Sequence, residues 1–206
     1  MDTVTSKFAP RSIKDVADLV RAQPFCWVVG IGNEAGAISA PLLVRCGGDG
    51  AIIGFEGHFA RSNPHVAALQ ADPRALILCQ GPHSYISSSW MQNRDWGPTW
   101  NFAQAQFRVA LEFFDQADAV EAHLRELVDV MEAGRPAAWS ADEMGERFHG
   151  VARGVIGFRA VVLHEESRFK LAQDEGAGPY ADILRGLEAQ GAVDLLGWTH
   201  RLNPDR

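Results

Sequence analysis

The sequence predicts a mainly β protein with peripheral helices, an α+β fold built on an antiparallel barrel. Apolar, β-rich runs at residues 25–31, 37–45 and 51–55 are separated by short turn-like stretches, which is typical of an antiparallel meander. A longer run at 99–114 alternates apolar and polar residues with the period of a strand. The helical patterns do not alternate regularly with strands, so the pattern favours a barrel with attached helices over a doubly wound parallel sheet.

In the first half of the chain, Ser12 and Asp15 form an N-terminal capping pattern that predicts a helix over 12–22. The three strands of the meander follow. Asn63 before Pro64 then predicts the start of a helix over about 64–71. A buried strand is expected at 74–80, ending in a turn at 81–83.

In the second half, a polar loop at 92–98 leads into the long strand at 99–114. A helix over about 118–133 has its apolar residues on one stripe, and Ser140 with Glu143 predicts a capping box for a helix over 141–149. Two paired strands are expected at 154–166 and 167–173, followed by a helix that starts at Pro179. The final fifteen residues show no period. The sum is six or seven strands and four or five helices in a single domain over 1–206.

Composition excludes several classes of protein. The formal net charge of −7 and the absence of a basic tract argue against binding to nucleic acid or to anionic membranes. The N-terminus has no apolar signal region, and no run is long enough for a membrane helix. Cys26, Cys46 and Cys79 form no CxxC pair and are expected to be reduced thiols, so we expect a cytoplasmic location.

The segment GIGNEA at 30–35 matches the dinucleotide-binding fingerprint G-x-G-x-x-G/A. That fingerprint binds pyrophosphate only where a helix follows the turn. The residues after it are strand-like and include Pro41. We therefore interpret the segment as a hairpin turn, with a nucleotide loop as the alternative.

The stretch from Gly57 to Asn101 concentrates polar and aromatic residues at turns, as binding sites do. A helix capped by Asn63 would present free backbone N–H groups and the positive end of its dipole. Arg61 and Ser62 come directly before it, and the three residues together predict an anion site suited to a phosphate monoester. The alternative is that Arg61 is a solvated loop residue and Asn63 only a cap.

Other chemistries lack support in the sequence. His58 and His65 are separated by a turn and a helix start, so a structural or ligand-contact role is favoured over metal binding. No GxSxG motif or pair of site carboxylates is present, which argues against hydrolase and glycosidase chemistry. A further set of residues suits a flat, heteroaromatic, phosphorylated ligand by stacking and hydrogen bonding: His58, Tyr85, Trp90, Trp100, Asn101, Lys170 and Gln173. The alternatives are core packing for the tryptophans and an exposed strand position for Lys170.

Six motifs occur in order along most of the chain: GHFARSNPH (57–65), QGPHSYISSSW (80–90), PTWN (98–101), PAAWS (136–140), RGVIGF (153–158) and FKLAQ (169–173). This ordered set resembles the PaiB family, the FMN-binding negative transcriptional regulators of the FMN-binding split-barrel fold. The resemblance implies a homodimer with FMN near the subunit interface. It implies that Arg61, Ser62 and Asn63 contact the phosphate, and that Trp100, Asn101 and the strand Lys170–Gln173 help to form the flavin pocket.

The sequence departs from the family pattern at the end of the site that would hold the flavin ring. Ser88 stands where the family commonly has proline, Met91 where it has tyrosine and Gln106 where it has histidine. FKLSQN becomes FKLAQD through Ala172 and Asp174. The phosphate end matches the family, whereas the ring end is altered, which bears more on the reaction than on flavin binding.

The resemblance implies a flavin-dependent oxidoreductase or flavin reductase acting on a small molecule, with a nicotinamide as a possible partner. One alternative is an FMN-binding regulator or sensor without catalysis, although neither a helix-turn-helix nor a basic face is evident. Another is a relative that binds haem or another planar cofactor, with His58 or His83 as the axial ligand. No metal site and no membrane association are expected.

Overall fold

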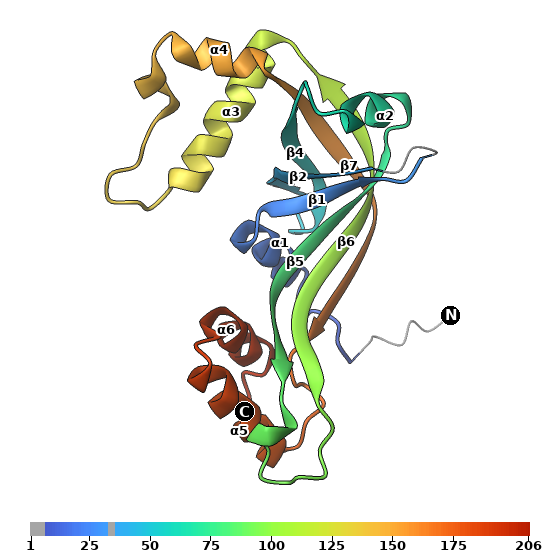
Figure 1. The fold of residues 1–206 in the computed structure, drawn as a ribbon, viewed down its shortest axis with the longest axis vertical. Coiled ribbons are helices and arrows are strands. Elements are labelled where there is room, and N and C mark those ends of the chain that lie inside the picture. Colours follow the sequence, from blue (N-terminus) through green and yellow to red (C-terminus); the bar gives the residue numbers. More distant parts are fainter. Residues whose placement is uncertain (1–6, 33–35) are drawn as a thin grey trace. The chain divides into compact units, whose positions relative to one another are not determined.

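A computed structural model describes residues 7–32 and 36–206 (Figure 1). The strands are β1 (Phe25–Gly30), β2 (Gly36–Pro41), β3 (Leu43–Cys46), β4 (Ile52–Ala60), β5 (Arg74–Ile86), β6 (Thr99–Phe114) and β7 (Val155–Lys170). The α-helices are α1 (Ile13–Ala22), α2 (His65–Ala71), α3 (Ala117–Glu132), α4 (Arg147–Arg153), α5 (Ala177–Ala189) and α6 (Val193–Leu202). Two 3₁₀ helices are η1 (Ser88–Trp90) and η2 (Ala141–Met144).

The described strands form one seven-stranded sheet in the order β2-β1-β5-β6-β7-β4-β3. β1 pairs antiparallel with both β2 and β5, and β4 pairs antiparallel with both β3 and β7. This arrangement confirms the predicted mainly β, antiparallel fold with peripheral helices.

The chain forms two compact units from interleaved segments. Unit 1 comprises residues 1–22, 80–105 and 166–206, and unit 2 comprises residues 23–79 and 106–165. Strands β5, β6 and β7 each contribute residues to both units. The single domain over 1–206 stays a prediction.

Unit 2 has an aromatic core. Phe59 stacks on Phe158 with ring centroids 4.4 Å apart, and Phe55 meets Phe107 edge to face at 4.9 Å. These four rings are buried and lie on β4, β6 and β7. A second apolar cluster joins the end of β6 to α3, η2 and α4 through Phe114, Val120, Leu124, Ala141, Phe148 and Ala152. Strand β4, which ends directly before Arg61, is therefore held by rigid packing.

In unit 1, ion pairs join helix α1 to helix α6. Arg201 on α6 donates to the buried carboxylate of Asp15 at 2.8 Å and to Asp18 at 2.6 Å, both on α1. Asp15 also accepts from the backbone N–H of Ser12 at 2.7 Å, as the predicted capping pattern requires. The buried carboxylate is thus fully engaged, which offsets the cost of its desolvation.

Several sequence-based expectations were wrong. The single helix expected at 141–149 is two elements, η2 and α4, separated at Gly145 with its positive φ of 53°. The expected turn at 81–83 is part of β5, because Gly81 without a side chain fits where a Cβ would lie 2.9 Å from the Ala103 carbonyl oxygen. The two strands expected at 154–166 and 167–173 are the single strand β7, since no turn residue interrupts it. The run at 37–45 is divided into β2 and β3 at Leu42, whose N–H donates to the Pro24 carbonyl oxygen. Helix α6 occupies the segment that showed no period.

Candidate functional site

The segment that follows β4 in unit 2 carries the predicted anion site. The register of β4 with β7 pairs Ala60 with Val155, and the Arg61 N–H extends this pairing to the Gly154 carbonyl oxygen at 3.0 Å. The Arg61 side chain donates through Nε to the Arg153 carbonyl oxygen at 3.2 Å. Its terminal nitrogen lies 3.9 Å from Asp115, and both side chains of this pair are exposed. Such a pair contributes at most about 1 kcal/mol, so the guanidinium can accept a stronger partner.

Asn63 has the predicted capping role. Its side-chain oxygen accepts from the backbone N–H of His65 at 3.0 Å, at the start of α2. Ser62 is exposed beside it. Helix α2 is only seven residues long, and Asn63 already occupies one of its free N–H groups, so little of the helix N-terminus is left to interact with an anion.

A pocket of about 420 Å³ opens beside Arg61. Its lining is Arg61, Asp115, Ala117, Val120, Glu121, His149, Ala152 and Arg153. The lining thus has two guanidinium groups, an apolar side, and two carboxylates, one of which contacts His149. This mixture suits a ligand with an anionic group and an apolar body.

His58 on β4 is joined to a histidine that the sequence did not single out. Its Nδ1 lies 3.1 Å from Nε2 of His123, which is buried on α3. His123 Nδ1 lies 3.5 Å from the Glu56 carboxylate, too far for a good hydrogen bond. Burial, and then the neighbouring His123, lowers the pKa of His58 to about 4, and burial also lowers the pKa of His123. Both rings are therefore neutral at neutral pH.

A network of charges surrounds this histidine pair. Arg45 on β3 donates to Glu126 on α3 at 2.6 Å and to Glu56 on β4 at 3.3 Å. The hydrogen bond from Arg45 is the main cause that lowers the pKa of Glu126. Burial outweighs these two carboxylates, because Glu56 and Glu126 both raise the pKa of His123 and it is still lowered overall.

We expect acid to destabilise unit 2 through His58. An unfolded His58 takes up a proton below about pH 6.5, whereas the folded side chain does so only near pH 4. Stability is therefore fully present above pH 6.5 and falls by on the order of 2–3 kcal/mol as the pH drops to 4. Urea unfolding at pH 7, 5.5 and 4.5 measures this. His58→Gln should flatten the profile and the exposed His83→Gln should not; an equal slope in both variants would contradict the assignment.

In unit 1, three rings gather on neighbouring strands β5 and β6. His83 and Tyr85 lie edge-on to Trp100, with centroid distances of 5.9 and 6.0 Å. Trp100 is 53% exposed and Tyr85 is 45% exposed. Large aromatic side chains at this exposure on adjacent strands form an apolar surface that is available to a flat ring.

Trp90 and Asn101 do not belong to the exposed aromatic surface formed by His83, Tyr85 and Trp100. Trp90 packs on α5, where a Cβ added to Gly186 would lie 2.2 Å from the indole, so Trp90 supports the fold of unit 1. Asn101 follows Trp100 on β6 and therefore points to the opposite face, where it is buried. Its Nδ2 has no hydrogen-bond partner among the described residues. A buried amide without a partner is costly and marks a group that a ligand could satisfy.

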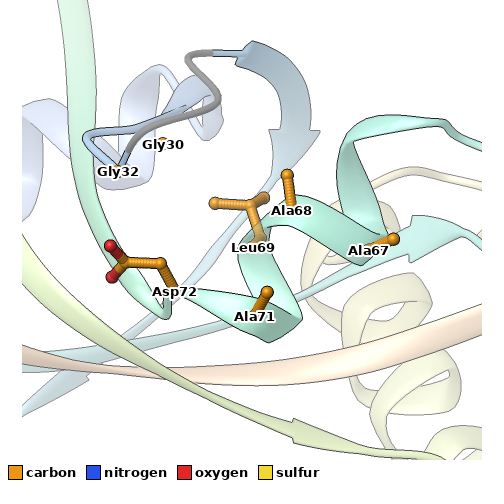
Figure 2. Close-up of a pocket in the computed structure, with 7 residues that line it drawn as sticks. All are labelled: Gly30, Gly32, Ala67, Ala68, Leu69, Ala71 and Asp72. Carbon is orange, nitrogen blue, oxygen red and sulfur yellow. The ribbon is translucent and has the colours of Figure 1, made fainter.

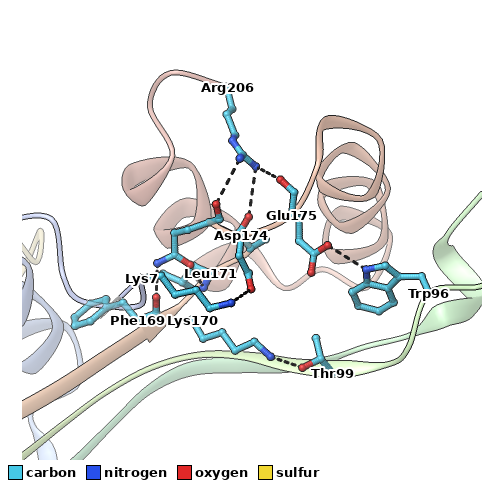
Figure 3. Close-up of polar contacts among 11 residues, drawn as sticks. Lys7, Trp96, Thr99, Phe169, Lys170, Leu171, Asp174, Glu175 and Arg206 are labelled. Carbon is cyan, nitrogen blue, oxygen red and sulfur yellow. Dashed lines mark hydrogen bonds and ion pairs between the residues drawn. The ribbon is translucent and has the colours of Figure 1, made fainter. Parts of the chain in front are cut away.

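Lys170 is the last residue of β7, where the strand leads into a tight loop (Figure 3). Gln173 follows three residues later in the sequence. Lys170 donates to the Thr99 hydroxyl group. The Gln173 side chain is turned back onto its own backbone: its oxygen accepts from Leu171 N–H at 2.6 Å, and its nitrogen donates to the Phe169 carbonyl oxygen. Lys170 thus keeps a cation beside β6, whereas the Gln173 amide serves mainly to hold the loop.

Ala172 lies at the centre of this loop with a positive φ of 63°, a conformation that non-glycine residues rarely adopt. Arg206 stabilises the loop by donating to the carbonyl oxygens of Glu175 at 2.8 Å and of Gln173 at 3.4 Å (Figure 3). Trp96 adds a hydrogen bond from its indole N–H to Glu175 at 3.0 Å. The FKLAQ motif is therefore held in a defined shape by its own Gln173 side chain and by Arg206 from outside it.

The structure also distinguishes the two interpretations of the segment at 30–35, a hairpin turn or a nucleotide-binding loop. Residues 33–35 of this segment lie outside the part of the chain that the structure describes. Gly30 pairs with Gly36 in a β1–β2 hairpin, and no helix follows, so the hairpin interpretation is confirmed. A pocket of about 550 Å³ adjoins Gly30 and Gly32 (Figure 2). Its other walls are the last residues of α2 and Asp72, whose carboxylate is bound by Arg74. The negative end of a helix and a carboxylate both disfavour a pyrophosphate.

The ten predicted residues thus form separate groups. Arg61, Ser62, Asn63 and His58 belong to unit 2, and the other six belong to unit 1. Sequence reasoning missed His123 and Arg153. His123 lies three residues after Val120 and four before Leu127, on the apolar stripe of its helix, and a histidine on such a stripe was a usable signal. Within the described residues no group of three or more His, Cys, Asp or Glu side chains could hold a metal.

Known proteins resemble this chain in sequence and in fold. Residues 3–164 match the FMN_bind_2 family, described as "Putative FMN-binding domain". The protease synthase and sporulation protein PAI 2 of Bacillus subtilis is 30% identical over 135 residues, which is 64% of this chain and 63% of that protein. The chain thus matches less than two thirds of this relative.

Solved structures share the fold at low sequence identity. A conserved hypothetical protein of Mycobacterium tuberculosis has a TM-score of 0.58 at 14% identity, covering 80% of this chain and 88% of its own. An FAD and heme binding protein of Mycobacterium smegmatis has a TM-score of 0.56 at 14% identity, covering 81% and 73%. No described helix has both the length and the apolar content needed to cross a membrane. The family match over most of the chain and the ordered motifs show that this chain belongs to the FMN-binding split-barrel family that includes the PaiB proteins.

Proposed function

We propose that this protein is a flavin-dependent oxidoreductase that binds FMN as a homodimer and transfers electrons between a nicotinamide and a small molecule. The observation that carries the proposal is the exposed aromatic surface of Trp100 and Tyr85 in a chain of the FMN-binding family. The flat, apolar ring system of FMN suits the aromatic surface of unit 1, and a phosphate suits the guanidinium group of Arg61 in unit 2.

The ring would bind against the aromatic surface of unit 1. Trp100 and Tyr85 offer apolar faces, and neighbouring His83 offers a hydrogen-bonding edge. Asn101 and Thr99, the hydrogen-bond partner of Lys170, alternate with Trp100 along β6 and lie on its other face. The buried Nδ2 of Asn101, which has no partner among the described residues, is therefore not assigned to a ring bound on the aromatic surface.

The phosphate would bind at Arg61. Its present partners are one carbonyl oxygen and a carboxylate 3.9 Å away. Charge-assisted hydrogen bonds to a phosphate contribute about 1.5–3 kcal/mol, more than the weak pair with Asp115. Ser62 would add a hydroxyl group, and Asn63 would hold the start of α2 in place.

When bound, FMN would supply the electron-transfer chemistry. The chain's own residues would bind and orient the ring, and those at the altered positions offer no general acid or base. Met91 is buried, Ser88 Oγ is buried in η1, and Gln106 is an amide. Hydride transfer does not need a protein acid or base, whereas hydrolysis and group transfer typically gain about 10²–10⁴-fold from one.

Anaerobic stopped-flow mixing of the FMN-loaded protein with NADH or NADPH tests this function. We expect loss of the flavin absorption band at a rate that rises with nicotinamide concentration and exceeds that of free FMN under the same conditions. Reduction by dithionite but by neither nicotinamide would overturn the nicotinamide-dependent reaction. It would favour a flavin sensor or a protein that needs a partner reductase.

A further inference from the structure

Two of the three cysteines are side by side in unit 2, although 52 residues of sequence separate them. Cys26 lies on β1 and Cys79 on β5. The register of these strands pairs Trp27 with Leu78, and the next position along places Cys26 opposite Cys79. Their sulfur atoms are 2.8 Å apart, and both residues are free thiols.

Backbone geometry allows these thiols to be joined without moving the strands. Directly opposite residues in an antiparallel pair have Cα atoms about 4.5–5.5 Å apart, and disulfides span about 4.4–6.8 Å. We propose that Cys26 and Cys79 are a thiol–disulfide pair, a modification site at which a small hydroperoxide links β1 to β5.

The burial of the two thiols determines which oxidants can reach them. Both side chains are buried, at 1% and 2% exposure, and Cys26 pairs across its other edge with Ala40 on β2. The Cys26 thiol and burial together raise the pKa of the Cys79 thiol, so Cys79 is protonated at neutral pH and reacts only slowly, because the thiolate is the reactive form. A large, charged disulfide such as oxidised glutathione cannot enter these surroundings, whereas hydrogen peroxide is small and uncharged.

The reaction balances with one peroxide. One thiol reacts with hydrogen peroxide to give a sulfenic acid and one water, as the O–O bond breaks and an S–O bond forms. The second sulfur then attacks the sulfenic sulfur, the S–O bond breaks, and a second water leaves. Together the two thiols lose two electrons and two protons. The second step is fast because the resolving thiol is already in place.

The disulfide would close a loop over residues 27–78, which carries β2, β3, β4, α2 and Arg61. Closing a loop of this length removes freedom from the unfolded chain. The oxidised protein should therefore unfold at a temperature higher by roughly 10 °C.

The test uses the full chain with Cys46→Ser, so that only the pair remains. The folded protein is treated with hydrogen peroxide, then denatured and alkylated, and its intact mass is measured. We expect loss of two hydrogen atoms, no alkylation, and full reversal by dithiothreitol. Oxidised glutathione should leave the folded protein unchanged.

Matched controls carry Cys26→Ser or Cys79→Ser in the same background. The lone thiol that remains should be alkylated or should gain oxygen atoms. Uptake of oxygen by the intact pair, or two thiols that stay alkylatable after peroxide, would overturn the proposal. If the Cys46→Ser protein does not fold, peptide mapping of the peroxide-treated native chain decides. A Cys26–Cys79 linked peptide supports the pair, and a link that involves Cys46 overturns it.

Discussion

Replacing Phe158 by alanine is expected to lower the free energy of unfolding by about 3–5 kcal/mol. Phe158 is fully buried, stacks on Phe59 at 4.4 Å and lies opposite Gly57 in the β4–β7 pair. A Cβ on Gly57 would lie 2.7 Å from this ring, so the ring fills the space that the glycine leaves. Truncation would leave a cavity beneath the strand that carries His58 and leads to Arg61.

Urea unfolding followed by circular dichroism measures this loss. Leu163→Ala is the matched control, because Leu163 lies on the same strand at 65% exposure and should change stability by no more than about 0.5 kcal/mol. A loss below about 1 kcal/mol for Phe158→Ala would contradict the central position of this ring.

Replacing Arg61 by alanine is expected to weaken FMN binding by about one to two decades while riboflavin binding changes little. The two ligands differ only in the phosphate, so a residue that contacts the phosphate affects FMN alone. The expected size follows from charge-assisted hydrogen bonds of about 1.5–3 kcal/mol. Quenching of flavin fluorescence during titration measures both affinities.

Arg147→Ala serves as the matched control, since Arg147 is an exposed arginine of the same unit that does not line the pocket beside Arg61. It should leave both affinities unchanged. Equal losses for FMN and riboflavin in Arg61→Ala would remove Arg61 from the phosphate.

Sequence patterns correctly predicted those elements whose start or alternation depends only on residues close together in the chain. The alternation after Thr99 predicted β6, and the Ser140–Glu143 capping box is present as both of its reciprocal hydrogen bonds. Asn63 caps α2 as expected. In each case the signal lies within a few residues of the element, so no knowledge of distant contacts was needed.

Features that depend on distant partners could not be predicted this way. Gly81 and Pro82 have the composition of a turn, yet the close approach of Ala103 keeps them in a strand. The hydrogen bond from Arg61 to the Arg153 carbonyl oxygen requires β4 to pair beside the start of β7, 92 residues later in the chain. Trp100 and Asn101 do not form one surface, because neighbouring residues on a strand point to opposite sides. The two side chains therefore lie on opposite faces of β6, although they are adjacent in sequence.

Sedimentation velocity of the purified protein with added FMN, followed at the flavin absorption band, tests the central claim most directly. We predict that flavin sediments with the protein, at one FMN per chain, in a species of twice the 22.5 kDa chain mass. The contradicting result is that the protein sediments while the flavin stays in solution, even at protein concentrations well above the usual micromolar range. That result would contradict FMN binding by this chain.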